Sequence, residues 1–192
     1  PTPIPALPAR KPARVLGDLR FLAPGSAVGG VARSPDGTRL ALGACVFDAA
    51  TGALDAAYDA GGNAVHKLAF APDGSRLYRG DGPGTHGHTL AVVDVPGRRQ
   101  LLTVPAFDWA VSGDGRLLAT LEHVPYDPDA GKPGPRTQLA HFYPAVRVYD
   151  TATWKGVAAY RVRGVAPTAV ALSPDGGHVV VGCGDGAVRV WD

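Results

Sequence analysis

Apolar and polar residues alternate over short stretches along most of the chain, and turn signals separate these stretches. Three of them stand close together near the end, at Val170 to Leu172, Val179 to Val181 and Ala187 to Trp191. A period of two residues predicts half-buried strands. The first two are separated by Ser173-Pro-Asp-Gly176, where proline presets one backbone torsion and glycine supplies a positive φ. The pattern predicts a small antiparallel sheet with tight turns.

The same turn occurs four times, each time between two apolar stretches. The four copies are Ser34 to Gly37, Ala71 to Gly74, Ser112 to Gly115 and Ser173 to Gly176. Each unit ends on an apolar or aromatic residue followed by aspartate, at Phe47-Asp48, Val93-Asp94, Tyr149-Asp150 and Trp191-Asp192. These aspartates are 42 to 56 residues apart, close to or above the period of about 40–45 residues found in some arrays of four-stranded units.

Each of the first three units continues into a fourth apolar stretch, at Ala53 to Tyr58, Gln100 to Val104 and Gly156 to Val162. The last unit has no residues left for one. A surplus stretch at Val15 to Leu22 precedes the first unit and can supply the missing strand. The pattern therefore predicts sixteen strands in four sheets.

These units resemble WD repeats, the four-stranded antiparallel blades of a β-propeller, whose signature ends in Trp-Asp. The resemblance covers Val15 to Asp192, and only the last unit has the full dipeptide, Trp191-Asp192. The glycine-histidine pair of the family is missing, since Gly62-Asn63 and Gly164-Val165 stand near its expected places. The resemblance implies an all-β propeller with four blades per chain, in which the N-terminal strand completes the last blade.

Three ways of closing such a ring stay open. Two chains can pair into an eight-bladed ring in which each N-terminal strand completes the last blade of the partner, and we rank this homodimer first because it pairs every sheet edge. The chain can instead be a fragment of a larger propeller. Closure of one chain on itself is the arrangement that we favour least.

The repeated aspartates and the final tryptophan are predicted to have structural roles. Aspartate in such turns accepts hydrogen bonds from the backbone that follows it. The structural positions are Asp36, Asp73, Asp114, Asp175, Asp48, Asp94, Asp150, Asp185 and Trp191.

The units differ most between their second and third strands. From the turn glycine to the final aspartate they have gaps of 11, 20, 35 and 16 residues. In a propeller these insertions lie on the same face, here as two loops, Gly80 to Thr89 and Glu122 to Pro144. Aromatic and arginine side chains are frequent anchors of interfaces. The partner-binding candidates are Tyr126, Asp127, Asp129, Arg136, His141, Phe142 and Tyr143.

We therefore expect a non-catalytic scaffold that binds a protein through this face. The second loop can alternatively pack on the rim, be disordered, or reach across a subunit boundary. Two other classes of function stay open: a self-assembling structural half-propeller, and a propeller enzyme that binds a metal or small ligand.

Candidate metal ligands are few. His86 and His88 alternate with a glycine, with Asp81 near them and His123 as a further candidate, and neutral imidazoles bind zinc or copper well. Two histidines in a glycine-rich segment are weak evidence, so we expect no metal and no cofactor. No catalytic motif is present, and we expect no catalytic residue.

Composition adds limits rather than a function. The chain is 45% apolar and 19% charged with a net charge of +2, which is typical of a globular domain and gives no basic face for nucleic acid. No apolar run is long enough to span a membrane. Residues 1–14 are rich in proline and are predicted to form an arm or linker before the propeller unit, residues 15–192.

Two cysteines, Cys45 and Cys183, are too few for a disulfide framework, so the compartment stays open. We favour the cytoplasm slightly over a location that follows removal of a leader. Arginine outnumbers lysine and methionine is absent, which indicates a GC-rich bacterial gene.

Arg33 is a departure from the repeat, because Phe70, Val111 and Leu172 occupy its place in the other units. A lone charge in that inward position would be costly to desolvate, so we expect a carboxylate partner or a shifted first blade.

Overall fold

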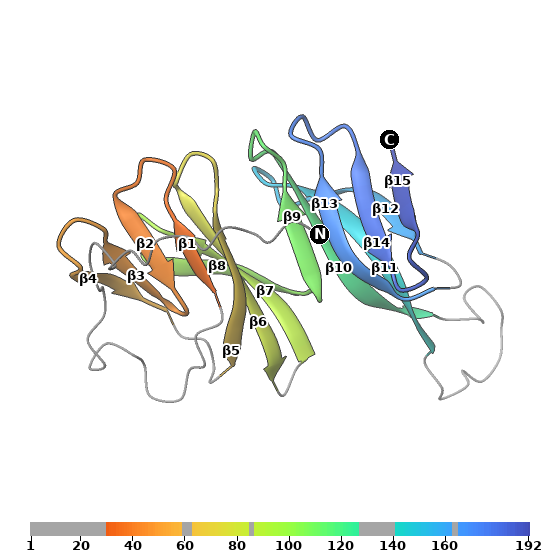
Figure 1. Cartoon of the computed structure of the whole chain (residues 1–192), viewed down its shortest axis with the longest axis horizontal. Helices are drawn as coiled ribbons and strands as arrows, with labels where there is room; N and C mark the ends of the chain where they lie inside the picture. The colour runs from red at the N-terminus through yellow and green to blue at the C-terminus, as the bar shows by residue number, and fades with distance from the viewer. Residues whose placement is uncertain (1–29, 59–62, 85–86, 127–140, 163–164) are drawn as a thin grey trace, which may run out of the picture.

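The described part of the chain consists of strands and turns. The computed structural model describes residues 30–58, 63–84, 87–126, 141–162 and 165–192 (Figure 1). Fifteen strands in these residues form four antiparallel sheets, and each sheet is one blade. This confirms the predicted all-β fold with four blades. The last sheet has three described strands, and the predicted completing strand, Val15 to Leu22, lies outside the described residues.

The blades follow one another in chain order. Blade 1 contains β1 (Val31–Arg33), β2 (Arg39–Leu42), β3 (Cys45–Asp48) and β4 (Leu54–Ala57). Blade 2 contains β5 (Ala64–Phe70), β6 (Arg76–Gly84), β7 (Gly87–Asp94) and β8 (Arg99–Pro105). Blade 3 contains β9 (Asp108–Val111), β10 (Leu117–Tyr126), β11 (His141–Asp150) and β12 (Gly156–Arg161). Blade 4 contains β13 (Pro167–Leu172), β14 (Val179–Cys183) and β15 (Val188–Trp191).

The repeated four-residue turn joins the first and second strands of every blade. In the first copy the N–H of Gly37 donates to the carbonyl of Ser34 at 2.9 Å, and Oγ of Ser34 donates to Asp36 at 2.6 Å. Asp36 also accepts the N–H of Thr38 at 3.0 Å. The four turn glycines have φ of 72–74°, a region that favours glycine. The sequence of the turn thus determines where each chain reversal occurs.

The aspartate of each repeated dipeptide caps a second turn. Asp48 accepts the N–H of Thr51 at 2.6 Å, and Asp150 accepts the N–H of Thr153 at 2.8 Å. Asp94 accepts the N–H of Gly97 at 3.2 Å. In blades 1 to 3 the register of the third and fourth strands shifts directly before the first residue of this dipeptide. The dipeptide therefore closes the third strand and begins the turn to the fourth.

The two ends of the blades form two sides of the molecule. The repeated turns lie together at the top of Figure 1, and we call this the turn side. At the bottom of Figure 1 lie the strand ends where the second strand of a blade leads to the third, those of β6, β7, β10 and β11. We call this the insertion side. The predicted gathering of the longer connections on one side is therefore what the described strands show.

The hydrophobic core is divided among the contacts between neighbouring blades. Val46 of blade 1 packs with Leu77 and Val93 of blade 2, and all three side chains are fully buried. A second cluster around Trp109 joins blades 2 and 3, and a third around Val181 joins blades 3 and 4. Neighbouring blades are thus held together by the apolar side chains of their facing sheets, which interdigitate between them.

The four blades form an open row in which blade 1 and blade 4 lie at opposite ends (Figure 1). In blade 4, Val179 and Val181 face blade 3, so the alternate residues of the sheet face away from it. This outer surface, which we call the end face, exposes Val188 by 66% and Val190 by 56%. Ala169 and Ala171 on β13, Val180 on β14, and Val188 and Val190 on β15 make up the end face. The row therefore ends on an apolar sheet surface.

Arg33 does not occupy a buried position. The residue is exposed at the outer end of blade 1, and its guanidinium donates to the carbonyl of Gly37 at 3.3 Å. The expected desolvation cost does not arise, because this face of β1 has no neighbouring blade among the described residues. The prediction of a buried charge was wrong for that reason.

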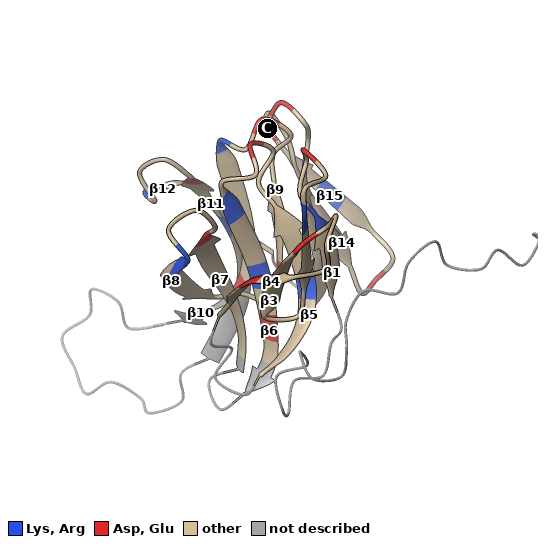
Figure 2. Cartoon of the chain, turned by 90° about the vertical axis from the view of Figure 1, so that its left-hand side faces the viewer, with Lys and Arg blue, Asp and Glu red and all other residues tan. Residues whose placement is uncertain are grey.

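Charged side chains are mixed over the surface. Figure 2, which looks onto the blade 1 end, shows acidic and basic residues on several strands and turns without one sign prevailing. No helix among the described residues is long and apolar enough to cross a membrane.

Candidate functional site

Blade 3 carries the longest hairpin of the described chain. Its strands β10 and β11 pair over ten residues, from Leu117 opposite Asp150 to Tyr126 opposite His141. The corresponding strands pair over four residues in blade 1 and four in blade 4. Six additional pairs at about 3.3 Å each extend this hairpin by roughly 20 Å on the insertion side.

This hairpin contains nine of the 23 residues of the expected 122–144 loop. Residues 122–126 and 141–144 continue the strands β10 and β11, which corrects the prediction that the whole segment is a loop. Pro125 and Pro144 lie within the paired strands and do not end the ladder. Among the predicted partner-binding residues, Tyr126 lies on β10, and His141, Phe142 and Tyr143 lie on β11. Asp127, Asp129 and Arg136 lie outside the described residues.

The glycine-rich segment of blade 2 also forms a hairpin rather than the predicted loop. Strand β6 extends to Gly84 and β7 begins at Gly87, so most of residues 80–89 are paired. The glycines favour this arrangement because they leave room for rings from the neighbouring strand and blade. A Cβ on Gly80 would lie 2.9 Å from Nε1 of Trp109 and 3.0 Å from Nε2 of His66.

A pair of histidines lies over this glycine surface, between blades 2 and 3. The ring centres of His66 on β5 and His88 on β7 are 5.7 Å apart, with the ring planes at 85°. The ring of Phe107 lies 5.5 Å from that of His88. The expected partner of His88, His86, lies outside the described residues. His66 was missed by the sequence analysis because no local motif marks it, and only the pairing of β5 with β6 places it there.

Asp81 is not available as the metal ligand suggested by the sequence. Its carboxylate accepts two hydrogen bonds from the guanidinium of Arg79, both at 2.8 Å. Both side chains are buried. Because residues alternate along β6, Asp81 lies on the face opposite to Gly80 and Gly82, above which the histidines lie.

Lys67 and Asp108 connect three blades near the inner strands. Nζ of Lys67 on β5 donates to Oδ1 of Asp108 at 2.5 Å and to the carbonyl of Trp109 at 2.6 Å. Oδ2 of Asp108 accepts the backbone N–H of Val170 on β13 at 2.9 Å. Asp108 at the start of β9 thus joins blades 2 and 4, and this acid has a structural role.

A second buried carboxylate lies on blade 3. Glu122 accepts hydrogen bonds from the hydroxyls of Thr120 at 2.6 Å and Tyr149 at 3.0 Å, and lies 3.5 Å from Nε of Arg147. Burial, and next the charge of Glu122, raise the pKa of Tyr149. An open depression of about 430 Å³ lies beside Arg147 and Tyr149 on the outer strands. Tyr149 and Arg147, which line this depression, both contact Glu122, as side chains of a structural network do.

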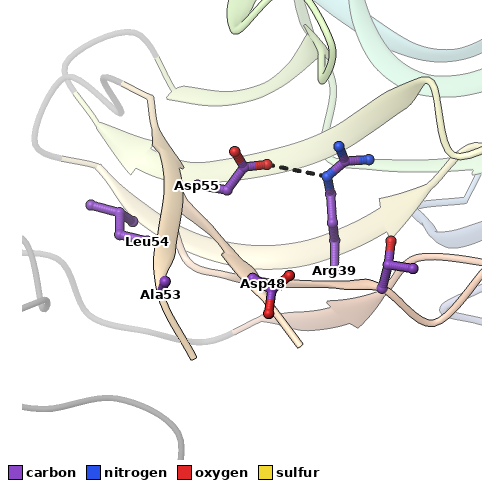
Figure 3. A pocket seen from close by; sticks show the side chains of 6 residues that line it. Arg39, Asp48, Ala53, Leu54 and Asp55 are labelled. Atoms are coloured by element: carbon purple, nitrogen blue, oxygen red, sulfur yellow. Dashed lines mark hydrogen bonds and ion pairs between the residues drawn. The ribbon is translucent and has the colours of Figure 1, made fainter. Parts of the chain in front are cut away.

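A depression of about 410 Å³ lies on the turn side, at the outer strands of blade 1 (Figure 3). Asp55 in this depression binds Nε of Arg39 at 3.1 Å and a terminal nitrogen of Arg98 in blade 2 at 2.7 Å. Asp48 in the same depression caps the turn that follows β3. Both acids are therefore occupied by structural contacts.

The remaining candidates for chemistry are weak. Cys45 and Cys183 are both buried and unpaired, and burial raises the pKa of the Cys45 thiol, which disfavours the reactive thiolate. Within the described ranges, no group of three or more histidine, cysteine, aspartate or glutamate side chains could hold a metal ion. His123 lies on β10, opposite Pro144.

The last repeat matches a known family. Residues 160–192 match the model of the WD domain, G-beta repeat. This segment contains β13, β14 and β15, together with Asp185, which accepts the N–H of Ala187 at 3.1 Å, and Trp191, whose ring lies 5.5 Å from that of Tyr160. No curated protein matches the chain by sequence.

The arrangement of the blades is similar to part of a solved propeller. The chain aligns with the structure titled Kuenenia stuttgartiensis Hydrazine Synthase at a TM-score of 0.58 and 17% sequence identity. The alignment covers 81% of this chain and 43% of that chain, so this chain spans less than half of its length. At this identity the likeness concerns the fold alone. Residues 160–192 thus match a WD repeat, and the four antiparallel blades have the fold of a β-propeller.

Proposed function

We propose that this chain is a non-catalytic scaffold that binds a protein partner on the insertion side of blades 2 and 3. The observation that supports the proposal most is the long β10–β11 hairpin, whose ten residue pairs exceed the four of blades 1 and 4. The features that all four repeats share form the scaffold. An insertion that lengthens the hairpin of one repeat, on the side where the insertions gather, is typical of a binding element. The WD-repeat family is consistent with an interaction scaffold.

The residues at the end of the hairpin fit an interface. Tyr126 pairs with His141, and Phe142 and Tyr143 follow directly on β11. Aromatic side chains provide a large contact area at low conformational cost and are enriched among the residues that dominate binding energy. The nearby described carboxylates Asp81 and Glu122 are held by neighbouring side chains, which favours binding over catalysis at this side.

Shortening the hairpin tests the proposal. Residues 123–144 are replaced by Asn-Gly, which closes the ladder after the pair Glu122 and Ala145 with a two-residue turn. We expect the far-UV circular dichroism spectrum and the melting temperature to stay close to those of the wild type. Proteins that co-purify reproducibly with the full chain from cells of its source should be lost, and purified partner should no longer bind in calorimetry.

An Arg116→Ala variant is the matched control. Arg116 is exposed on the turn side, far along the blade from the hairpin end. This variant should retain the partner. Retention of the same partner, at the same affinity, by a folded chain with the shortened hairpin would show that the binding surface lies elsewhere.

The end face supports a second candidate function, self-assembly with a second copy of this chain. Each described core is formed by one face of a blade and the opposite face of the next, so the end face of blade 4 corresponds to surfaces that are covered elsewhere in the chain. Blade 4 of one copy can pack on blade 1 of a second copy in the same way as neighbouring blades pack within the chain. Two such contacts between two copies close a ring. The alternative occupant is a further blade of a larger propeller.

A further inference from the structure

The space above Gly82 brings together two imidazole nitrogens from different strands. A Cβ on Gly82 would lie 2.6 Å from Nδ1 of His88 and 3.1 Å from Nδ1 of His66. Both nitrogens therefore lie close to one point, the position that the Cβ atom would occupy if residue 82 were not glycine. His66 is held on β5 and His88 on β7, and β6, which carries Gly82, lies between these strands.

The Nδ1 atom of His88 has no hydrogen-bond partner among the described residues. This atom is buried. Buried polar atoms are nearly always paired, so an exception of this kind calls for a partner such as a water molecule or an ion. The neighbouring carboxylate cannot supply one, because Asp81 is bound to Arg79.

The other nitrogen is suited to donate its lone pair. Among the atoms of the His66 ring, Nδ1 lies nearest to the Cβ position of Gly82, at 3.1 Å. Metal ions bind neutral imidazole, and a proton on the ring competes with them.

We propose that Nδ1 of His66 and Nδ1 of His88 bind one Zn²⁺ ion, or a transition-metal ion of similar preference, above Gly82. Two imidazoles that share an ion at the usual Zn–N distance of about 2.0–2.1 Å have ring centres about 5–6 Å apart. The observed separation of the ring centres is 5.7 Å. The remaining positions of the ion are open to water, because His66 is exposed.

The site differs from the one suggested by the sequence, which paired His88 with His86. It lies on the insertion side but does not depend on the proposed protein partner. With two protein ligands it is an open site rather than a closed structural one, since structural zinc sites have four.

Gly82→Ala is the decisive variant, because it adds a single methyl group at the point where the two nitrogens meet and keeps both histidines. Gly156→Ala is the matched control, since a Cβ there has no atom within 4 Å. The full-length chain and both variants, together with His66→Gln, are titrated with Zn²⁺ alone in calorimetry, and circular dichroism and melting curves verify that each is folded.

We expect one Zn²⁺ site per chain in the wild type and in Gly156→Ala. Gly82→Ala and His66→Gln should weaken this site by about tenfold or more, the loss typical of disturbed metal ligation. His66→Gln also separates this site from one formed by the other histidines of the chain. An undiminished site in either folded variant, or the absence of a site in the wild type, would overturn the proposal.

Discussion

Arg79 and Asp81 form an ion pair between blades 1 and 2 in which both side chains are almost fully buried, with 2% and 5% of their surfaces exposed. The two hydrogen bonds of 2.8 Å give the pair a bidentate geometry. Charges buried in this way lose their hydration, and the geometry of the pair offsets that loss. The pair therefore matters less for its own energy than for what happens when one member is removed.

Asp81→Ala should lower the free energy of unfolding by about 3–5 kcal/mol, because it leaves the buried guanidinium of Arg79 without its carboxylate. The double variant Arg79→Leu with Asp81→Val should recover most of this loss. Urea denaturation of both variants measures the difference. Asp55→Ala, which breaks the more exposed pairs with Arg39 and Arg98, should cost only about 0–1 kcal/mol. Equal losses for the single and the double variants would contradict this explanation.

Residue roles could be predicted from the sequence only where local chemistry determines them. The bonds of Asp36 and Asp48 follow from the turns in which they occur, and the sequence predicted them as structural positions. The roles of His66, Asp81 and Arg33 depend on what lies across the sheet or beyond the blade. The pairing of β5 with β6 decides the first, the buried ion pair of Asp81 with Arg79 on the same face of β6 decides the second, and the absence of a described neighbour beside β1 decides the third.

The four-residue turns make the stability of the fold depend on pH. Hydrogen bonds from Ser34, and next from the backbone and side chain of Thr38, lower the pKa of Asp36 from 3.8 to about 2. The corresponding pKa values of Asp73, Asp114 and Asp175 are also lowered by hydrogen bonds within their turns. Because the ionised form is the one that the fold favours, these turns contribute stability at pH values above about 4.

Asp36→Asn should destabilise the chain at neutral pH, and the difference from the wild type should shrink as the pH falls from about 4 to about 2. The reason is that the wild-type carboxylate becomes protonated in that interval and loses the advantage of its charge. Urea denaturation at a series of pH values measures the difference. A gap between the two proteins that stays constant from pH 5 to pH 2 would contradict the role of ionised Asp36.

At the scale of elements, the number and order of strands could be predicted, and the lengths of two hairpins could not. Each turn and each dipeptide marks a strand end by local bonding, which is why the fifteen described strands agree with the predicted ones. The segments at 80–84 and 122–126 read as loops because of their glycine, proline and charge. They form strands because cross-strand pairing and contacts such as those of Gly80 with Trp109 act over long separations.

The described residues as a whole form a row of four blades held by three shared cores, with an apolar face at one end. Within these residues, blades 2 and 3 are covered on both faces, and blade 4 is covered on one. The repeat count could be predicted from the sequence, whereas ring closure depends on contacts outside the described residues. An exposed apolar sheet surface next to an edge strand tends to find a partner.

Val190→Lys should reduce the association of the chain with a second copy. Val190 is 56% exposed on the end face, and a lysine there would have to be desolvated in the contact with another blade. Light scattering over a range of concentrations should give twice the mass of the chain for the wild type and the mass of one chain for the variant. Val157→Lys is the matched control, because Val157 is 57% exposed on β12 in blade 3 and lies outside the end face. A wild-type chain that stays monomeric at every concentration would exclude the homodimer and favour a further blade as the occupant of the end face.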